Sequence, residues 1–250
     1  MYLNSEKWTG VARYNEAIAM CDSIIDGGNY SLEGNYFDNF TIQNENSGEV
    51  IFAMPLDKLI GDFGFQMHMY TLHWALLKKY DLEGTWCWNG LCMTEAMYDS
   101  FDSNDSRIEG WEVGPQYYFN GDPVYGYEGG QLTFTKTITN LDWSPEGEGV
   151  RCFKWELPTG LSEWETMSND FSIFRYADVL LMKAEAIMRN SGNEISSDAT
   201  VLSLVNEIRT RAFGDTNHDY SELTLDKFLA ERGRELAFEE HRRQDLISMG

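Results

Sequence analysis

Three amphipathic stretches between residues 170 and 250 constrain the fold of this chain more than any other feature of its sequence. In each stretch, apolar residues recur at three- and four-residue steps, which places them on one face of a helix. The inward positions are Ile173, Phe174, Ala177, Leu180, Leu181, Ala184 and Ile187; then Val201, Leu204, Val205 and Ile208; then Leu225, Phe228, Leu229 and Leu236. Helices joined by short turns pack as hairpins, so residues 170–250 are predicted to form a helical bundle.

The ends of these helices are also marked in the sequence. Asp170 stands where the N-cap of the first stretch belongs, and Ser191-Gly192 supplies its C-terminal stop. The second helix is expected to end near Phe213-Gly214, and the third to begin at Thr224.

Charged residues interrupt the apolar face of the third stretch and flank that of the first. They are Arg232, Glu235, Glu239, Arg242 and Arg243 in the third stretch, and Arg175 and Glu185 in the first. Solvent-facing charge pairs are the simpler interpretation. Because charges of both signs lie on helices that must pack, we instead expect an internal ion-pair network. Such a network fixes register more than it adds stability, and its matched cations argue against a catalytic role for the carboxylates.

Several long segments resemble one known family. They are RYADVLLMKAEA (175–186) with ERGRELAFEEHRRQDL (231–246), the N-terminal YLNSEKWTGVARYNEAIAMCDSIIDGGNYSL (2–32), NYFDNF (35–40), NENSGEVIFAMP (44–55) and WNGLCMTEAMYDSFDSNDSRI (88–108). In their order along the chain, these segments resemble the SusD/RagB family of outer-membrane nutrient-binding lipoproteins of Bacteroidetes. One departure is Glu240, where the family pattern leads us to expect glycine before the His-Arg pair, and it leaves the local turn open.

The resemblance implies a mainly α fold of tetratricopeptide-like hairpins, with no cofactor. It also implies a whole protein about twice this length, of which residues 1–250 would be the C-terminal portion of one larger domain. Such a protein would sit at the outer membrane facing outwards, held by a lipid anchor outside this chain. It would pass oligosaccharides to a SusC-like TonB-dependent transporter.

Outside the bundle, residues 1–30 are expected to form one tetratricopeptide-like hairpin that ends at Gly27-Gly28, and Glu49–Met54 a short strand. Residues 85–165 lose helical periodicity and form a long, loop-rich and aromatic-rich excursion. A helix from about Thr94 to Phe101 interrupts it. Gln131 to Ile138 alternates like a strand that could pair with Tyr117 to Phe119.

Composition excludes several classes of protein. A net charge of −22 argues against nucleic-acid binding, because phosphate recognition needs a basic surface. No apolar run approaches the roughly 20 residues of a membrane helix, and no signal peptide is visible. Four cysteines are too few for a disulfide scaffold, and the spacing of Cys87 and Cys92 leaves a bridge and free thiols equally open.

Aromatic residues of the excursion are the candidate ligand contacts, because an aromatic ring can cover the apolar C–H face of a sugar. Six of the eight tryptophans lie there: Trp86, Trp88, Trp111, Trp143, Trp155 and Trp164. The leading candidates are Trp86, Trp88 and Asn89, and the second set is Trp111, Tyr117, Tyr118, Tyr125, Tyr127 and Trp143. The alternative for any one of these aromatics is that it anchors its own loop on the helices.

Two metal sites are weaker hypotheses. Asp102, Asn104 and Asp105 are oxygen-rich enough for calcium but lack the other ligands of an EF-hand loop, so a turn is preferred. His68 and His73 are five residues apart and poorly spaced for a zinc site with the two nearby cysteines, so core or loop positions are preferred.

Three function classes follow: a non-enzymatic binder of oligosaccharides, a binder of another nutrient such as peptide (which the RagB branch implies), and a glycosidase with two carboxylates. A plain helical scaffold is a further alternative. Among 41 acidic residues a pair of carboxylates is trivial to find, and no catalytic motif accompanies one. The sequence therefore favours binding.

Overall fold

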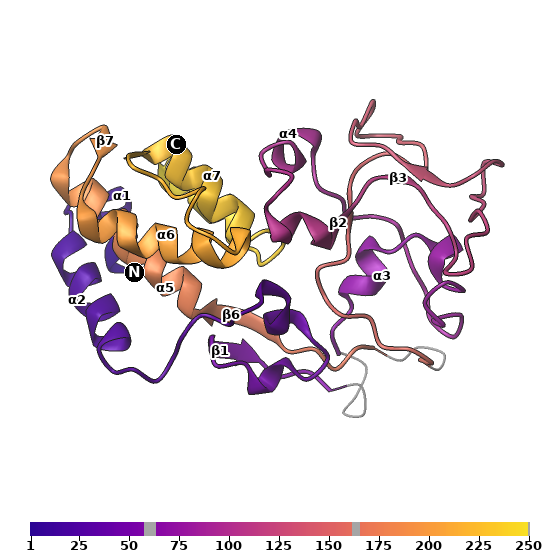
Figure 1. Cartoon of the computed structure of the whole chain (residues 1–250), viewed down its shortest axis with the longest axis horizontal. Coiled ribbons are helices and arrows are strands. Elements are labelled where there is room, and N and C mark those ends of the chain that lie inside the picture. Colours follow the sequence, from indigo (N-terminus) through magenta and orange to yellow (C-terminus); the bar gives the residue numbers. More distant parts are fainter. Residues whose placement is uncertain (58–63, 162–165, 250) are drawn as a thin grey trace.

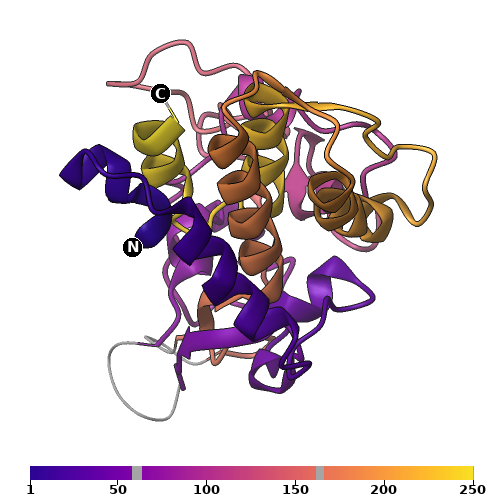
Figure 2. The same ribbon diagram turned by 90° about the vertical axis from the view of Figure 1, so that its left-hand side faces the viewer.

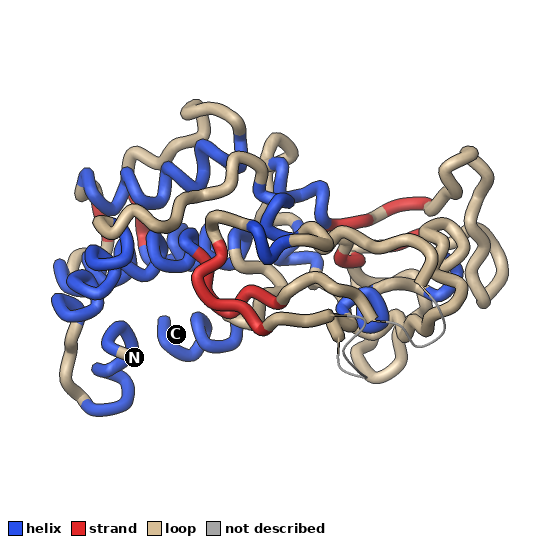
Figure 3. Tube along the Cα trace, turned by 90° about the horizontal axis from the view of Figure 1, so that it is seen from below, coloured by secondary structure: helices blue, strands red, loops and turns tan. Residues whose placement is uncertain are grey.

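The computed structural model describes residues 1–57, 64–161 and 166–249. Helices gather at one end of the long axis and loops at the other, with a two-stranded sheet between them (Figure 1). Seen from below, the division is equally clear (Figure 3). We refer to residues 1–32 and 176–249 as the helical region, and to residues 64–161 as the loop region. The expected fold class, mainly α with an aromatic-rich excursion, is confirmed.

Six helices build the helical region: α1 (Ser5–Thr9), α2 (Tyr14–Ile25), α5 (Tyr176–Ser191), α6 (Ala199–Phe213), α7 (Leu225–Glu235) and α8 (Arg242–Met249). Helix α5 packs against both α2 and α6 (Figure 2). The expected inward positions Val201, Leu204, Val205, Ile208 and Phe228 are buried. Strands β7 (Ile195–Ser196) and β8 (Leu223–Thr224), which precede and follow α6 in the chain, pair antiparallel in a two-stranded sheet.

Most helix ends fall where the sequence predicts. Gly192 and Gly214 end α5 and α6 in the left-handed conformation, at φ +68° and +75°. The Thr224 hydroxyl accepts a hydrogen bond from the Lys227 amide at 3.2 Å, so it caps α7 as expected. The ends of α5 and α6 and the start of α7 can therefore be read from the sequence.

The predicted start of the first stretch is wrong. Residues Phe171–Arg175 form strand β6, which pairs antiparallel with β1 (Val50–Met54), and helix α5 begins only at Tyr176. The Asp170 carboxylate accepts a hydrogen bond from the Leu56 amide at 2.8 Å instead of capping a helix. Ile173 and Phe174 fit a helical period by spacing, but pairing with β1 satisfies their backbone groups as a strand.

The loop region has little regular structure. Its helices are α3 (Met67–Thr71) and α4 (Glu95–Tyr98), and its paired strands are β2 (Trp111–Glu112) with β5 (Arg151–Cys152) and β3 (Gly114–Pro115) with β4 (Thr133–Phe134). The expected strand over 131–138 is thus shortened, and it does not pair with Tyr117–Phe119. Tyr117 pairs with Pro123 and Tyr125 with Gln131, because the chain folds back on itself between them.

An ion-pair network at the junction joins the two regions, and the predicted members Arg175, Glu235 and Glu239 belong to it. Arg242 does not, because it donates to the Leu229 carbonyl, and Arg243 is exposed. Glu235 of α7 contacts Arg107, Arg175 and Arg211 at 3.0, 2.8 and 2.5 Å. The other pairs of the network link Arg107 to Asp105 and Glu231, Arg175 to Glu49 and Glu239, Arg211 to Glu49, Lys154 to Glu239, and Arg209 and Arg234 to Glu231. Arg232 forms a separate cluster with Asp178 and Asp245.

The loop after α7 shows why the family pattern has glycine at the position of Glu240. Phe238 and Glu240 adopt φ of +61° and +65°, the left-handed region that favours glycine. This backbone returns the Glu239 carboxylate to the network, where it meets Lys154 at 2.5 Å. Among the described residues, no helix is long and apolar enough to cross a membrane.

Candidate functional site

Two pairs of exposed aromatic rings stand on the loop region. In the first pair, Tyr70 and Trp88 lie 4.9 Å apart between ring centroids, in an edge-to-face arrangement. Tyr70 comes from α3, and the Trp88 amide donates a hydrogen bond to the Met69 carbonyl at 2.7 Å. Trp88 remains 53% exposed. Backbone hydrogen bonds therefore hold the Trp88 loop on α3 while its ring faces solvent.

The second pair is Trp74 and Tyr127, whose ring centroids lie 6.2 Å apart at 81°. Trp74 begins a short 3-10 turn (Trp74–Leu76), which His73 caps by accepting the Ala75 amide on Nδ1 at 3.0 Å. Both rings are exposed. Because Tyr70 and Trp74 lie four residues apart, one segment of the chain carries a member of each pair.

Three residues tie the loops of these pairs together. The side-chain amide of Asn89 donates to the Glu146 carbonyl at 2.8 Å, and Arg151 donates to the Asn89 side-chain oxygen at 2.7 Å. Arg151 also donates to the Glu146 carbonyl at 2.9 Å. Asn89 adopts φ +53°, which asparagine tolerates better than most residues. Both polar atoms of its side-chain amide therefore bond the loops, and its role as a ligand contact stays a prediction.

The remaining candidates divide into exposed and buried groups. Trp86, Tyr117, Tyr125, Tyr127 and Trp143 are exposed, and Tyr118 is half-buried. Tyr118 and Tyr125 line a hollow of about 600 Å³ together with Lys78, Lys79 and Phe119. Trp111 is 5% exposed and belongs to the core of the loop region, so it anchors loops and cannot present its ring to a ligand. Trp164 lies outside the described residues.

Tyr70, Trp74 and Phe119 are exposed rings that the sequence did not single out. Tyr70 and Trp74 precede the loop-rich excursion, within a segment whose apolar character concealed them. Phe119 directly follows Tyr117 and Tyr118, so its place in an aromatic run was the available signal.

The two weaker metal hypotheses meet different local structures. The Asp102 carboxylate accepts from the Asn104 amide at 2.8 Å, as in a turn, and Asp105 pairs with Arg107 at 2.7 Å. His68 is buried, and burial lowers the pKa of its ring to about 4. Within residues 1–57, 64–161 and 166–249, no group of three His, Cys, Asp or Glu side chains is placed to hold a metal ion.

All four cysteines are free thiols, which settles the question of Cys87 and Cys92. Burial raises the pKa of the Cys87 thiol to about 12, so it stays protonated near neutral pH.

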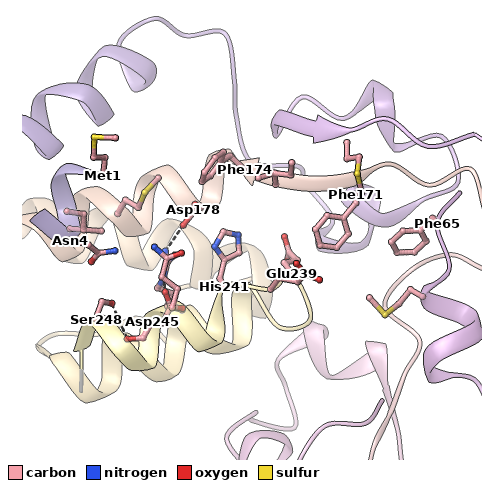
Figure 4. A pocket seen from close by; sticks show the side chains of 18 of the residues that line it. Met1, Asn4, Phe65, Phe171, Phe174, Asp178, Glu239, His241, Asp245 and Ser248 are labelled. Atoms are coloured by element: carbon pink, nitrogen blue, oxygen red, sulfur yellow. Dashed lines mark hydrogen bonds and ion pairs between the residues drawn. The ribbon is translucent and has the colours of Figure 1, made fainter. Parts of the chain in front are cut away.

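A larger cleft of about 660 Å³ lies beside the helical region. Figure 4 shows its walls, which include Met1, Asn4, Phe65, Phe171, Phe174, Asp178, His241, Asp245 and Ser248. Tyr70 lies at its border with the aromatic surface. Its lining combines Met and Phe side chains with network carboxylates and no tryptophan, so stacking on sugar faces favours the two ring pairs instead.

Comparison with known proteins identifies the relatives of this chain. The model of the SusD family matches residues 48–247. A SusD-like protein, P25 of Formosa agariphila, is 36% identical over 92% of this chain and 45% of its own length. The chain therefore spans about half the length of this relative.

Solved structures share the fold. Surface glycan-binding protein A from Bacteroides thetaiotaomicron, in complex with laminarihexaose, aligns with a TM-score of 0.71 at 23% identity, covering 95% of this chain and 50% of that one. A crystal structure with a xylogluco-oligosaccharide aligns with a TM-score of 0.71 at 22% identity, covering 99% and 48%. From the family match and the 36% identical relative, the chain belongs to the SusD family.

Proposed function

We propose that this chain binds oligosaccharides without cleaving them, at the surface formed by the ring pairs Tyr70–Trp88 and Trp74–Tyr127. The observation that carries the proposal is that these four rings are exposed while hydrogen bonds fix the loops beneath them. A large aromatic side chain normally gains by burial, so a rigid exposed pair is a surface prepared for a ligand. The ligands of the two solved structures support sugars as that ligand.

The arrangement matches the chemistry of a sugar chain. Each pyranose offers an apolar face to a ring and hydroxyl groups at its edge. Tyr117, Tyr125 and Trp143 are further exposed rings of the loop region, and Trp86 lies two residues from Trp88. Several exposed rings suit an oligosaccharide better than a single sugar.

The non-enzymatic part of the proposal rests on the state of the carboxylates. The buried carboxylates of the network face guanidinium groups, and three arginines, Arg107, Arg234 and Arg209, hold the pKa of Glu231 at about 2 despite the opposing effect of burial. A general acid for glycoside cleavage needs a raised pKa. Burial raises the pKa of Glu112 and of Glu185, but Lys79 lies 4.0 Å from Glu112 and Arg189 lies 2.7 Å from Glu185, and both cations oppose that rise. Near the ring pairs, the Glu146 carboxylate is occupied by backbone amides.

At the level of the whole protein, we propose delivery of the oligosaccharide to a SusC-like TonB-dependent transporter at the outer membrane, through a lipid anchor outside this chain. Family membership supports this step. Purifying the full-length protein from its native membrane tests it, because a transporter should accompany it without added cross-linker. Recovery of the protein free of any transporter would contradict this part alone.

Replacing Trp88 with alanine tests the binding surface. Trp88→Ala should weaken oligosaccharide binding at least about tenfold, which is about 1.4 kcal/mol, and leave the melting temperature nearly unchanged. Titration calorimetry with laminarihexaose, a xylogluco-oligosaccharide and a panel of short peptides measures the first quantity. The matched control is Trp8→Ala, because Trp8 is 79% exposed on α1 of the helical region.

The panel also separates the alternatives. Binding of peptides with silence across all oligosaccharides would make the chain a peptide binder. New reducing ends after incubation with a bound oligosaccharide would make it a glycosidase. A large melting loss in Trp88→Ala would make Trp88 a core residue instead of a ligand contact.

A further inference from the structure

The carboxylate of Glu146 occupies a seat made by three donors. The Tyr127 amide donates to Oε2 and the Glu128 amide to Oε1, both at 2.9 Å. His73 Nε2 lies 3.1 Å from Oε2. Because His73 Nδ1 already accepts the Ala75 amide, the ring proton of the neutral histidine stands on Nε2 and points to the carboxylate.

The glycine at position 126 makes this seat possible. A Cβ at Gly126 would lie 2.1 Å from Oε1 of Glu146, far inside contact distance. The turn that follows is closed by the Gly126 amide, which donates to the Gly130 carbonyl at 3.2 Å. Successive backbone amides around a carboxylate form an anion-binding concavity, so this turn is shaped around the Glu146 side chain.

The segment that carries Glu146 is fixed from the other side. A Cβ at Gly147 would lie 2.3 Å from the Thr133 carbonyl, and the Thr135 amide donates to the Gly147 carbonyl at 2.9 Å. The Glu146 side chain is only 17% exposed, yet its side-chain partners include no lysine or arginine among the described residues. The negative charge of Glu146 therefore faces the amides of Tyr127 and Glu128 and the ring of His73.

The Glu146 carboxylate contacts the chain next to both rings of the second pair. On one side Tyr127 is the residue whose amide Glu146 accepts. On the other, His73 precedes Trp74, and their ring centroids lie 4.9 Å apart. We propose that Glu146 is a positioning residue that sets Tyr127 edge-on to Trp74 and so builds this half of the binding surface. The proposal rests on the proposed function.

Two variants break the seat by different routes. Glu146→Gln keeps the side-chain size but turns its Nε2 toward a donor, so one of the two loop amides loses its acceptor. Gly126→Ala leaves the glutamate and all four rings intact and pushes the carboxylate out of its place. In both, amide hydrogen exchange at residues 127–128 should become at least tenfold faster, and laminarihexaose or xylogluco-oligosaccharide binding should weaken about tenfold. The melting temperature should move by only a few degrees.

Glu148→Gln is the matched control. Glu148 is also a carboxylate that orders a loop, but it accepts from Thr139 and Ser144 beside the exposed Trp143. This variant should leave exchange at residues 127–128 unchanged.

The results separate the two proposals. If the wild-type chain binds and Glu146→Gln binds equally well, or if exchange at residues 127–128 does not rise, the positioning role of Glu146 is wrong while the proposed function stands. If the wild-type chain binds no oligosaccharide, the proposed function fails, and the ligand-positioning role fails with it.

Discussion

The two regions of this molecule use buried charge in different ways. At the junction with the helical region, carboxylates face guanidinium groups, as where Glu235 meets three arginines. In the loop region, the Glu146 carboxylate faces backbone amides and a neutral histidine. The first arrangement locks side chains of packed helices in register. The second gives shape to loops that lack secondary structure, so a surface built from loops can still be rigid.

Within the loop region, aromatic residues have two different roles. The loop region contains its own core, in which Trp111 and Trp155 are 5% and 4% exposed. On the same scaffold Trp88 and Trp143 are 53% and 83% exposed. The buried rings therefore hold the loops that carry the exposed rings. This comparison predicts that substitutions of buried rings change stability, whereas substitutions of exposed rings change binding.

The largest effect is expected at the junction. Glu235→Ala removes the buried carboxylate that Arg107, Arg175 and Arg211 all contact, which should lower the free energy of unfolding by about 3–5 kcal/mol. Urea unfolding followed by circular dichroism measures the change. The control is Glu222→Ala, whose exposed pair with Lys227 at 3.9 Å should contribute less than about 1 kcal/mol. Equal losses in the two variants would remove the distinction between the network and surface pairs.

The next effect is expected in the core of the loop region. Trp111→Ala should cost about 3–5 kcal/mol of unfolding free energy through the cavity it leaves, because the ring packs against Phe101 and Phe238. Below its melting temperature the variant should still bind the oligosaccharide that the wild-type chain binds. Thermal melts and calorimetry on the same sample test both statements, and a stable variant with lost binding would return Trp111 to the ligand surface.

Much of the helical region could be predicted from sequence because its period, caps and apolar faces agree. The glycines at 192 and 214 and the cap at Thr224 mark helix ends by local chemistry alone. Only the members of the ion-pair network that lie in residues 170–250 were predicted. Arg107 and Lys154 reach it from distant loops, and no periodic pattern connects such positions to α7.

The candidate site was harder to predict, because a ring that stacks on sugar and a ring that fills a core have the same sequence signature. Trp88 and Trp111 both stand in loop-rich sequence, and only the packing of strand β2 separates them. Trp74 was hidden within an apolar segment for the same reason. The partnership of Glu146 with His73 joins residues 73 positions apart through a turn that sequence does not reveal.

The smallest and most local effect is expected on acidification. Burial raises the pKa of Glu146, but hydrogen bonds from the amides of Glu128 and Tyr127 and from the His73 ring lower it by more, so the pKa lies below the usual value. Burial lowers the pKa of His73, and this effect is larger than the opposing effect of the nearby Glu146 carboxylate. A depressed carboxyl pKa stabilises the folded loops above the ordinary glutamate value of about 4.3, and this stability is lost as the pH falls through the folded pKa.

Protonation of His73 acts in the same direction, because it places a proton on Nδ1 where the Ala75 amide now donates. Arg151, which contacts the Glu146 carbonyl, keeps its charge throughout. Burial opposes the charge of Glu231, but its arginine partners hold its pKa at about 2, so this carboxylate keeps its contacts at the junction down to about that pH. Between pH 6 and pH 3, the protection factor of the amides at residues 127–128, which is the intrinsic exchange rate at each pH divided by the observed rate, should therefore fall while far-ultraviolet circular dichroism stays constant. Simultaneous loss of both signals would mean that the loop region is not separable from the helical region.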